Sequence, residues 1–314
     1  MPASRGVHRG IPYYAHILPH KTASKGKTER LNIGFFQWTY AGVFTVGVER
    51  GVSGLEGLVC KARRYVVLMA GYDPGIHLGS SLSVLEIVAA LYGTGRLKFN
   101  VANGAHNRNY LVLSKGHAVH AIYALAAAMG YLTVDELRET GSIGSRLQNH
   151  PETDTPFVDV PNSGSLGQGV SMAVGLALGL RLKGEPGRVY LVTGDGELDE
   201  GQTWESLAVA AHYNLTNLVT IVDLNNVQLD GHSEEVLRKG DVAGRFKALG
   251  FEVVEVNGHD LKEITAALEK AENNAKPTAI IARTVRGRGV PPIEDTARQR
   301  LSRDDALKYA NDVC

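Results

Sequence analysis

Two short motifs contain residue types that could hold a cation together with phosphate groups. The motif Gly194-Asp195-Gly196 directly follows one apolar stretch, and Asn225 follows a second, one strand–helix–strand unit later. Glycines let the backbone approach a ligand and leave N–H groups free to face an anion. One carboxylate, one amide oxygen and one backbone carbonyl suit Mg²⁺ or Ca²⁺, with positions left for water and phosphate oxygens. Each motif alone is also a common turn.

Three histidines in glycine-, proline- or serine-containing segments are candidates for proton transfer: His77, His117 and His150. An unperturbed imidazole has a pKa of about 6.5, which suits general acid–base catalysis near neutral pH. Any one of them could instead cap a helix or fill the core. Structural or surface roles are expected for the remaining histidines of the central region, namely His106, His120, His212, His232 and His259.

The elements that must position these residues alternate between helical and strand patterns. Continuous apolar strands between helices predict an α/β fold, a doubly wound and mostly parallel sheet with helices on both faces. Ser83, with Glu86 three residues later, is expected to cap its helix. The predicted helices are 55–70, 83–92, 119–129, 167–182, 202–212, 242–249 and 261–271, and the strands are 110–113, 188–193, 217–223, 251–255 and 279–284. Such sheets bind ligands at the carboxyl ends of their strands, where both polar motifs lie.

Composition narrows the function classes. The chain has 314 residues, with 33 Lys and Arg against 33 Asp and Glu, which gives no basic footprint for nucleic acid or a membrane surface. No apolar run reaches the roughly 18 residues of a transmembrane helix. The two cysteines, Cys60 and Cys314, are too few for a disulfide framework, which favours a reducing compartment such as the cytoplasm.

The charge balance conceals an asymmetric amino terminus. Residues 1–50 carry seven Lys and Arg and two acidic residues, so the rest of the chain has a net charge of −5. We interpret residues 1–51 as an extension that is disordered, transit-like or the product of an upstream start codon. The expected organisation is this extension, one domain over 52–290 and a carboxy-terminal tail over 291–314.

Several segments together resemble the transketolase family of thiamine diphosphate enzymes. Gly194-Asp195-Gly196 followed by Asn225 looks like the motif that binds thiamine diphosphate. The segments most similar to transketolase are 76–86 (IHLGSSLSVLE), 113–120 (LSKGHAVH), 149–152 (NHPE), 163–169 (SGSLGQG), 194–201 (GDGELDEG) and 223–231 (DLNNVQLDG). They occur in the order typical of the family and cover about residues 52–300, which correspond to its diphosphate-binding half.

The resemblance implies a role for each matching residue. Asp195, Asn225 and the carbonyl of Val227 would bind Mg²⁺, Ca²⁺ or Mn²⁺, and Gly194 and Gly196 would lie at the diphosphate. His117 would contact the diphosphate, while His77 and His150 would face the sugar and assist proton transfer. Ser165, Leu166, Gly167 and Leu229 match positions near the cofactor rings, and Glu200 matches a glutamate buried between subunits.

The chain also departs from the family pattern. Many members have a histidine after the last strand, near a Thr-x-x-Gly-x-Gly segment that begins here at Thr284. No histidine follows it in this chain, so Arg286 or Arg288 could replace that contact. The pyrimidine-binding half, which supplies the glutamate that activates the cofactor, is absent.

The resemblance therefore implies one subunit of a split enzyme. The expected activity is transfer of a two-carbon ketol unit from a ketose phosphate to an aldose phosphate, in carbohydrate metabolism such as the pentose phosphate pathway. A separate C-terminal subunit would complete a heterotetramer, with self-association through the diphosphate domain. The alternatives are the alpha subunit of a 2-oxo-acid dehydrogenase and a non-catalytic assembly paralogue. No nucleic acid or membrane partner is expected.

Overall fold

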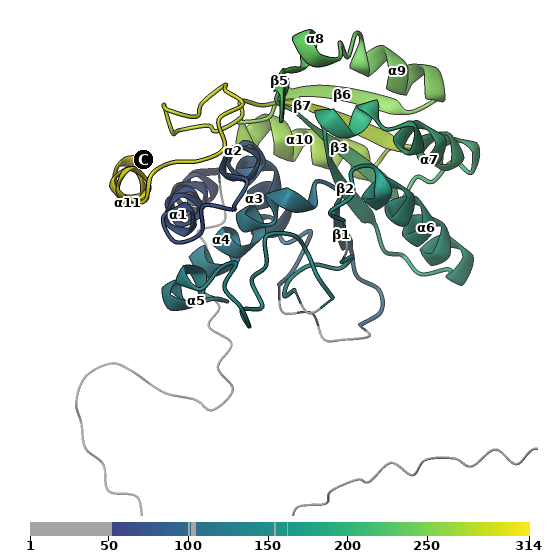
Figure 1. Ribbon diagram of the computed structural model, residues 1–314. Coiled ribbons are helices and arrows are strands. Elements are labelled where there is room, and N and C mark those ends of the chain that lie inside the picture. The colour runs from purple at the N-terminus through teal and green to yellow at the C-terminus, as the bar shows by residue number, and fades with distance from the viewer. Residues whose placement is uncertain (1–51, 100, 102–104, 154, 162) are drawn as a thin grey trace, which may run out of the picture. The chain divides into compact units, whose positions relative to one another are not determined.

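The computed structural model describes residues 52–99, 101, 105–153, 155–161 and 163–314, so the predicted extension over 1–51 lies outside the described residues (Figure 1). No described helix is long and apolar enough to cross a membrane. The helices are α1 (Val52–Ala70), α2 (Leu78–Ser83), α3 (Leu85–Gly93), α4 (His120–Ala128), α5 (Val134–Arg138), α6 (Gln168–Lys183), α7 (Gly201–His212), α8 (Ser233–Val236), α9 (Val242–Leu249), α10 (Leu261–Glu272) and α11 (Arg303–Asp312). Two short 3-10 helices are η1 (Gly116–Ala118) and η2 (Asp195–Asp199).

The strands form a five-stranded parallel sheet in the order β1-β2-β3-β7-β6. Their bounds are β1 (Tyr110–Leu113), β2 (Val189–Gly194), β3 (Leu218–Leu224), β6 (Glu252–Asn257) and β7 (Thr278–Arg283), and a small antiparallel pair is formed by β4 (Val227–Gln228) and β5 (Gly231–His232). After β3 the chain passes to the far edge and then returns to insert β7 beside β3. The carboxyl ends of β1, β2, β3 and β7 are therefore neighbours along one edge of the sheet.

Helices cover both faces of the sheet and bury two separate apolar cores, as the sequence predicts (Figure 1). One core contains residues of α1, α3, α4, α10 and α11, and the other contains residues of α6, α7 and α9. Alternate residues of β2 contribute to opposite cores, because successive strand side chains point to opposite faces. Tyr190 and Val192 lie in the first core, and Val189 and Leu191 lie in the second.

One predicted helix start is wrong. Ser83 ends α2 instead of capping the next helix, and α3 begins after Val84 without a side-chain cap. The hydroxyl of Ser83 donates to Asp223, and Glu86 pairs with Arg63 and His259. Long-range partners inside the protein thus take both side chains that the local pattern assigned to a capping box.

The carboxy-terminal segment returns to the first described helix. Helix α11 packs beside α1 with Ala306 and Ala310 buried (Figure 1). Cys60 of α1 and Cys314 form a disulfide whose Cα atoms are 5.8 Å apart, although 254 residues separate them in sequence. This pairing corrects the expectation of two unpaired cysteines. Cysteine number alone could not reveal that the last residue lies against α1.

Candidate functional site

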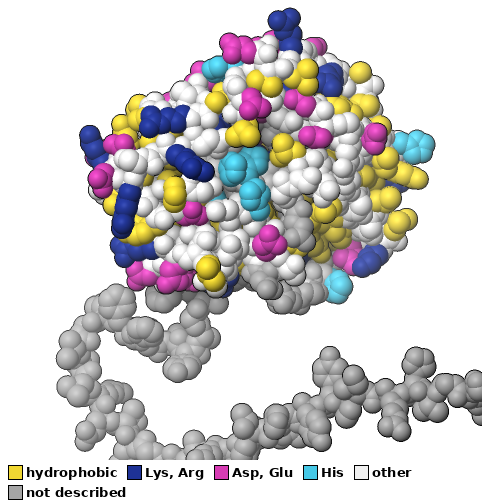
Figure 2. Space-filling model, in the orientation of Figure 1, with side chains coloured by type: hydrophobic (Ala, Val, Ile, Leu, Met, Phe, Trp, Pro, Cys, Tyr) yellow, Lys and Arg dark blue, Asp and Glu magenta, His cyan; other side chains and the backbone are white. Residues whose placement is uncertain are grey.

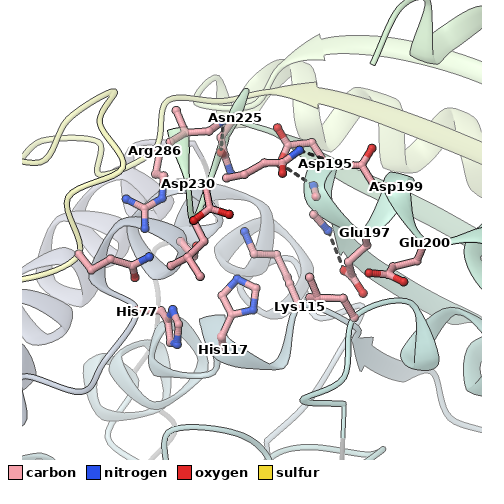
Figure 3. A pocket seen from close by; sticks show the side chains of 18 of the residues that line it. His77, Lys115, His117, Asp195, Glu197, Asp199, Glu200, Asn225, Asp230 and Arg286 are labelled. Atoms are coloured by element: carbon pink, nitrogen blue, oxygen red, sulfur yellow. Dashed lines mark hydrogen bonds between the residues drawn. The ribbon is translucent and has the colours of Figure 1, made fainter. Parts of the chain in front are cut away.

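A cavity of about 390 Å³ lies at the carboxyl edge of the sheet, where β2 and β3 end (Figure 3). Loops after β1, β2, β3 and β7 all contribute to it, because these strands are neighbours in the sheet. Ser165 and Gly167 are not among its lining residues, although their neighbours Gly164 and Leu166 are. The predicted residues that line it are His77, His117, His150, Leu166, Gly194, Asp195, Gly196, Glu200, Asn225, Val227 and Leu229.

Asp195 and Asn225 lie at the ends of two adjacent parallel strands. Gly194 is opposite Asp223 in the register of β2 and β3, so the residues that follow each strand meet at the cavity. Asp195 is 3% exposed and Asn225 is 4% exposed. Burial, reinforced by the carboxylate of Asp223, raises the pKa of Asp195 to about 6. A buried carboxylate in this state is stabilised by a cation.

The donor set around Asp195 fits a hard cation such as Mg²⁺. The side-chain oxygen of Asn225 accepts a hydrogen bond from the N–H of Val227 at 3.1 Å, which fixes a tight turn in which Asn226 has a φ of 59°. In the described part of the chain, no group of three or more His, Cys, Asp and Glu side chains is arranged to hold a metal. A cation here would therefore bind one carboxylate with neutral oxygens, a mode that Mg²⁺ uses when phosphates complete its coordination.

A second buried carboxylate, Glu197, organises the loops beside the cation site, and the sequence analysis missed it. It accepts the N–H groups of Gly167 and Gly194, both at 2.9 Å, and the hydroxyls of Ser114 and Thr193. The N–H of Gly194 was expected to be free to face an anion. That expectation is wrong, because Glu197 already accepts it.

The three predicted histidines lie together although they come from three loops. The ring centroid of His77 is 5.0 Å from that of His117 and 5.7 Å from that of His150. Figure 3 shows His77 and His117 facing the cavity from the same side, and Figure 2 shows histidine side chains gathered near the centre of this face.

Burial is the main cause that lowers the pKa of each of these histidines. The lowering is largest for His117, where the neighbouring Lys115 adds to the effect. The expectation of imidazoles titrating near their usual pKa is therefore corrected. All three rings are neutral at pH 7, so each offers one N–H donor and one nitrogen that can accept a proton.

An ion pair between Lys115 and Asp223 lies beneath the cavity. The two side chains are 1% and 0% exposed, and Lys115 also lines the cavity wall. Asp223 accepts further hydrogen bonds from Ser83 and Thr284. Lys115 lies inside the Lys-Gly-His segment, yet the sequence analysis assigned it no role, because a lysine in a loop gives no sign of being buried.

Arg286 and Gln299 enter the cavity from the segment after β7, and Arg288 does not. The buried guanidinium of Arg286 donates to the carbonyls of Thr296 and Arg298, at 2.8 and 3.1 Å. Arg288 instead pairs with Glu294 at the surface. Of the two expected replacements for the family histidine, Arg286 therefore has the required location. Gln299, which the sequence analysis missed, is hydrogen-bonded to His77.

The backbone around Arg286 is fixed on both sides. The N–H of Gly287 donates to the carbonyl of Gly79 at 3.0 Å, and a Cβ on Gly79 would lie only 2.4 Å from the Arg286 guanidinium. The N–H of Val285 donates to His259 Nε2 at 2.8 Å. His259, expected to be structural, therefore holds the segment that carries Arg286.

The outer rim of the cavity is open and partly apolar. Leu166 and Leu229 are 37% and 69% exposed. Glu200 lines the same cavity and is also exposed, whereas the resemblance matched it to a buried glutamate. In this single chain nothing described covers it, so its burial would require another subunit.

Comparison with known proteins identifies what the chain is similar to. The family model described as transketolase, thiamine diphosphate binding domain, matches residues 67–305. One of the two subunits of an apulose-4-phosphate transketolase from Actinobacillus succinogenes is 37% identical over 239 residues, which are 74% of this chain and 84% of that protein. A 6-deoxy-6-sulfo-D-fructose transketolase subunit from Clostridium sp. is 38% identical over 68% of this chain and 78% of its own length.

The match to complete transketolases is confined to part of their length. The human transketolase is 40% identical over 226 residues, which are 70% of this chain and 35% of that protein. A solved structure of a transketolase variant from Pichia stipitis superimposes with a TM-score of 0.75 and 30% identity, covering 82% of this chain and 40% of that one.

The buried ion pair predicts a strong stability coupling. Lys115→Met leaves the Asp223 carboxylate without its cation, and Asp223→Asn leaves the ammonium without its anion. Each single variant should lose about 3–5 kcal/mol of unfolding free energy, because an uncompensated charge remains buried. The double variant should lose clearly less than the sum of the two. Urea unfolding of all variants measures this difference.

The matched control is Lys270→Met, which removes the lysine of an exposed pair with Glu252. Exposed pairs contribute about 0–1 kcal/mol, so this variant should differ little from the wild type. Additive losses for Lys115→Met and Asp223→Asn would show that the two groups do not stabilise each other.

Proposed function

This chain belongs to the transketolase family, and on that premise we propose that it is the thiamine diphosphate-binding subunit of a two-chain transketolase. The proposed reaction transfers a two-carbon ketol unit from a ketose phosphate to an aldose phosphate. The observation that carries the proposal is one cavity in which buried Asp195 and Asn225 lie with three neutral histidines. Of the subunit relatives, one is named for apulose-4-phosphate and another for 6-deoxy-6-sulfo-D-fructose.

We propose that Asp195, Asn225 and the carbonyl of Val227 hold Mg²⁺, or Ca²⁺ or Mn²⁺, and through it the diphosphate of the cofactor. Thiamine diphosphate, when bound, supplies the carbon nucleophile and the electron sink that ketol transfer requires. The N–H of Gly196 and the side chain of His117 are the proposed direct contacts to the diphosphate. The N–H groups of Gly194 and Gly167 are excluded from that role because they donate to Glu197.

His77 and His150 are the proposed proton carriers at the sugar hydroxyls. A neutral imidazole can accept a hydroxyl proton at one nitrogen while its other nitrogen donates a hydrogen bond. The hydrogen bond from Gln299 holds the His77 ring at the cavity wall. Arg286 is the proposed replacement for the family histidine, because its hydrogen-bond partners are uncharged carbonyls and its positive charge remains available to an anion.

The assembly is the next part of the proposal. The exposed Leu166 and Leu229 at the cavity rim would be covered by a separate C-terminal subunit that carries the pyrimidine-binding half. The share of complete transketolases that this chain covers, 35% of the human protein, supports a missing second part. Glu200 would become buried in the same contact.

Self-association is proposed through the outer face of α6. A Cβ added at Gly175 or Gly179 would meet no atom within 4 Å, and Met172 and Leu182 beside them are 36% and 79% exposed. Such a flat apolar face allows close approach of a second copy, which would give a heterotetramer of two plus two chains. A cytoplasmic location and a place in the pentose phosphate pathway follow from the same resemblance to complete transketolases.

The proposed function predicts activity that depends on a second chain. The purified full chain should show no ketol transfer with a ketose phosphate, an aldose phosphate, thiamine diphosphate and Mg²⁺. Addition of the separate subunit that carries the pyrimidine-binding half should restore transfer, measured by the appearance of the new ketose. Full activity without a second polypeptide would overturn the two-chain assignment, and no transfer with both chains would overturn the activity.

Asp195→Ala tests the cation site. The variant should lose Mg²⁺-dependent binding of thiamine diphosphate, because the cation loses its carboxylate ligand. Titration calorimetry of the assembled complex measures the binding. Asp135→Ala, which removes an exposed carboxylate on α5, is the control and should bind as the wild type does. Unchanged cofactor affinity in Asp195→Ala would place the cation elsewhere.

His77→Ala separates binding from chemistry. Cofactor affinity should be unchanged, while turnover should fall by ~10²–10⁴-fold if the imidazole acts as a general acid or base. His106→Ala removes a histidine at the surface and should leave turnover unchanged. Normal turnover in His77→Ala would mean that this loop does not contribute to proton transfer.

A further inference from the structure

The three loops that carry the histidines of the cavity are joined by a chain of polar side chains outside the cavity. Asp73 precedes His77 by four residues, and Asn149 directly precedes His150. His120 follows His117 by three residues, at the start of α4. Asp73, Asn149 and His120 do not line the cavity, and the sequence analysis gave none of them a site role.

Asn149 is bonded to both of the other loops. Its Nδ2 donates to Asp73 Oδ2 at 2.8 Å, and its Oδ1 lies 3.0 Å from His120 Nε2. The carboxylate of Asp73 can only accept, so the amide nitrogen must face it and the amide oxygen must face His120. His120 must then carry its proton on Nε2. One amide therefore fixes the orientation of groups from all three loops.

His120 is a permanent donor in this arrangement. Its ring is 0% exposed, and Nδ1 has no hydrogen-bond partner among the described residues. Burial is the main cause that lowers its pKa to about 4, with the hydrogen bond to Asn149 acting in the opposite direction. The ring is therefore neutral over the whole range in which sugar chemistry near neutral pH takes place, and the connection does not titrate there.

Asp73 is itself held firmly. Its Oδ1 accepts the N–H of Gly75 at 2.7 Å, which closes the turn that leads to His77. A Cβ on Gly141, where φ is 73°, would lie 2.0 Å from Asp73 Oδ2. The loop before Asn149 therefore approaches Asp73 too closely for any side chain at Gly141.

The rings of the cavity have little other support against one another. Within the described residues, no hydrogen bond joins His77, His117 and His150 directly; their mutual contacts are ring packing at 5.0 and 5.7 Å. Their relative placement then depends on how the three loops are held. The connection through Asn149 is the polar link between those loops.

We propose that Asn149 is a positioning residue that sets the relative placement of the three histidine loops by bonding Asp73 and His120 at once. The inference rests on the proposed ketol-transfer function of the histidines. A shift of about 1 Å in a positioned group can lower turnover by about 10²-fold, so loss of this link should slow the reaction without removing any group that contacts substrate.

The test compares Asn149→Ala with Asn217→Ala in the assembled two-chain enzyme. Asn217 is a matched control, because it is also partly buried and its Nδ2 donates to the carbonyl of Ala177 at 2.9 Å, at the opposite end of β3. Asn149→Ala should lower kcat by about 10–100-fold with unchanged affinity for thiamine diphosphate. Asn217→Ala should keep the wild-type kcat even if its melting temperature falls equally.

An exchange of the two side chains tests the link itself. Asn149→Asp places two carboxylates opposite each other and should be at least as impaired as Asn149→Ala. Adding Asp73→Asn restores an amide facing a carboxylate, so the double variant should regain most of the lost kcat. Failure of the exchange to restore any activity, with a melting temperature near that of the wild type, would overturn the proposal.

A readout independent of activity uses the full chain with isotope-labelled histidine. Asn149→Ala should shift the NMR resonances and titration curves of His77, His117 and His150, and Asn217→Ala should not. Equal spectra for Asn149→Ala and the wild type would overturn the positioning role. Absence of ketol transfer in the wild-type complex would instead overturn the proposed function, and the spectra would still test the link.

Discussion

The buried carboxylate of Asp223 is the contact on which the candidate site depends. It pairs with Lys115 after β1 and accepts hydroxyl hydrogen bonds from Ser83 at the end of α2 and Thr284 after β7. Each of these segments also carries a cavity residue within a few positions, namely His117, His77 and Arg286. A buried charge is stable only when paired and hydrogen-bonded, so all these segments must be in place together. The condition that stabilises Asp223 is therefore also the condition that assembles the cavity.

Glu197 plays the corresponding part at the cofactor side of the cavity. Its two oxygens are satisfied by two backbone N–H groups and two hydroxyls from β2 and the segments that end at Ser114 and Gly167. Because Glu197 and Asp223 lie at the ends of neighbouring strands, the base of the cavity is a preorganised polar layer. Preorganised groups need not be reoriented when charge develops during a reaction, which is the property that catalytic sites exploit.

The sequence predicted the parts of the site that depend on local pattern and sheet topology. Asp195 and Asn225 could be placed together because each follows a buried strand, and parallel neighbours end at one edge. The free N–H of Gly194 and the ordinary pKa of the histidines were predicted wrongly, because the partner or the burial comes from residues far along the chain. Gln299 and Asn149 were missed for the same reason. A polar tail gives no sign of its return to the cavity, and an Asn in a loop is usually a turn former.

The charges that line the cavity explain why a cation belongs to its function. Two cationic side chains, Lys115 and Arg286, face five carboxylates, and the positive charge of Lys115 is already paired with Asp223. The carboxylates are Asp195, Glu197, Asp199, Glu200 and Asp230. A diphosphate would therefore enter a negatively charged cavity, where like charges raise the free energy of binding. A divalent cation at Asp195 reverses the local sign, and Arg286 adds a fixed positive group. Anion binding by this chain thus requires a metal ion, which the overall charge of the protein cannot replace.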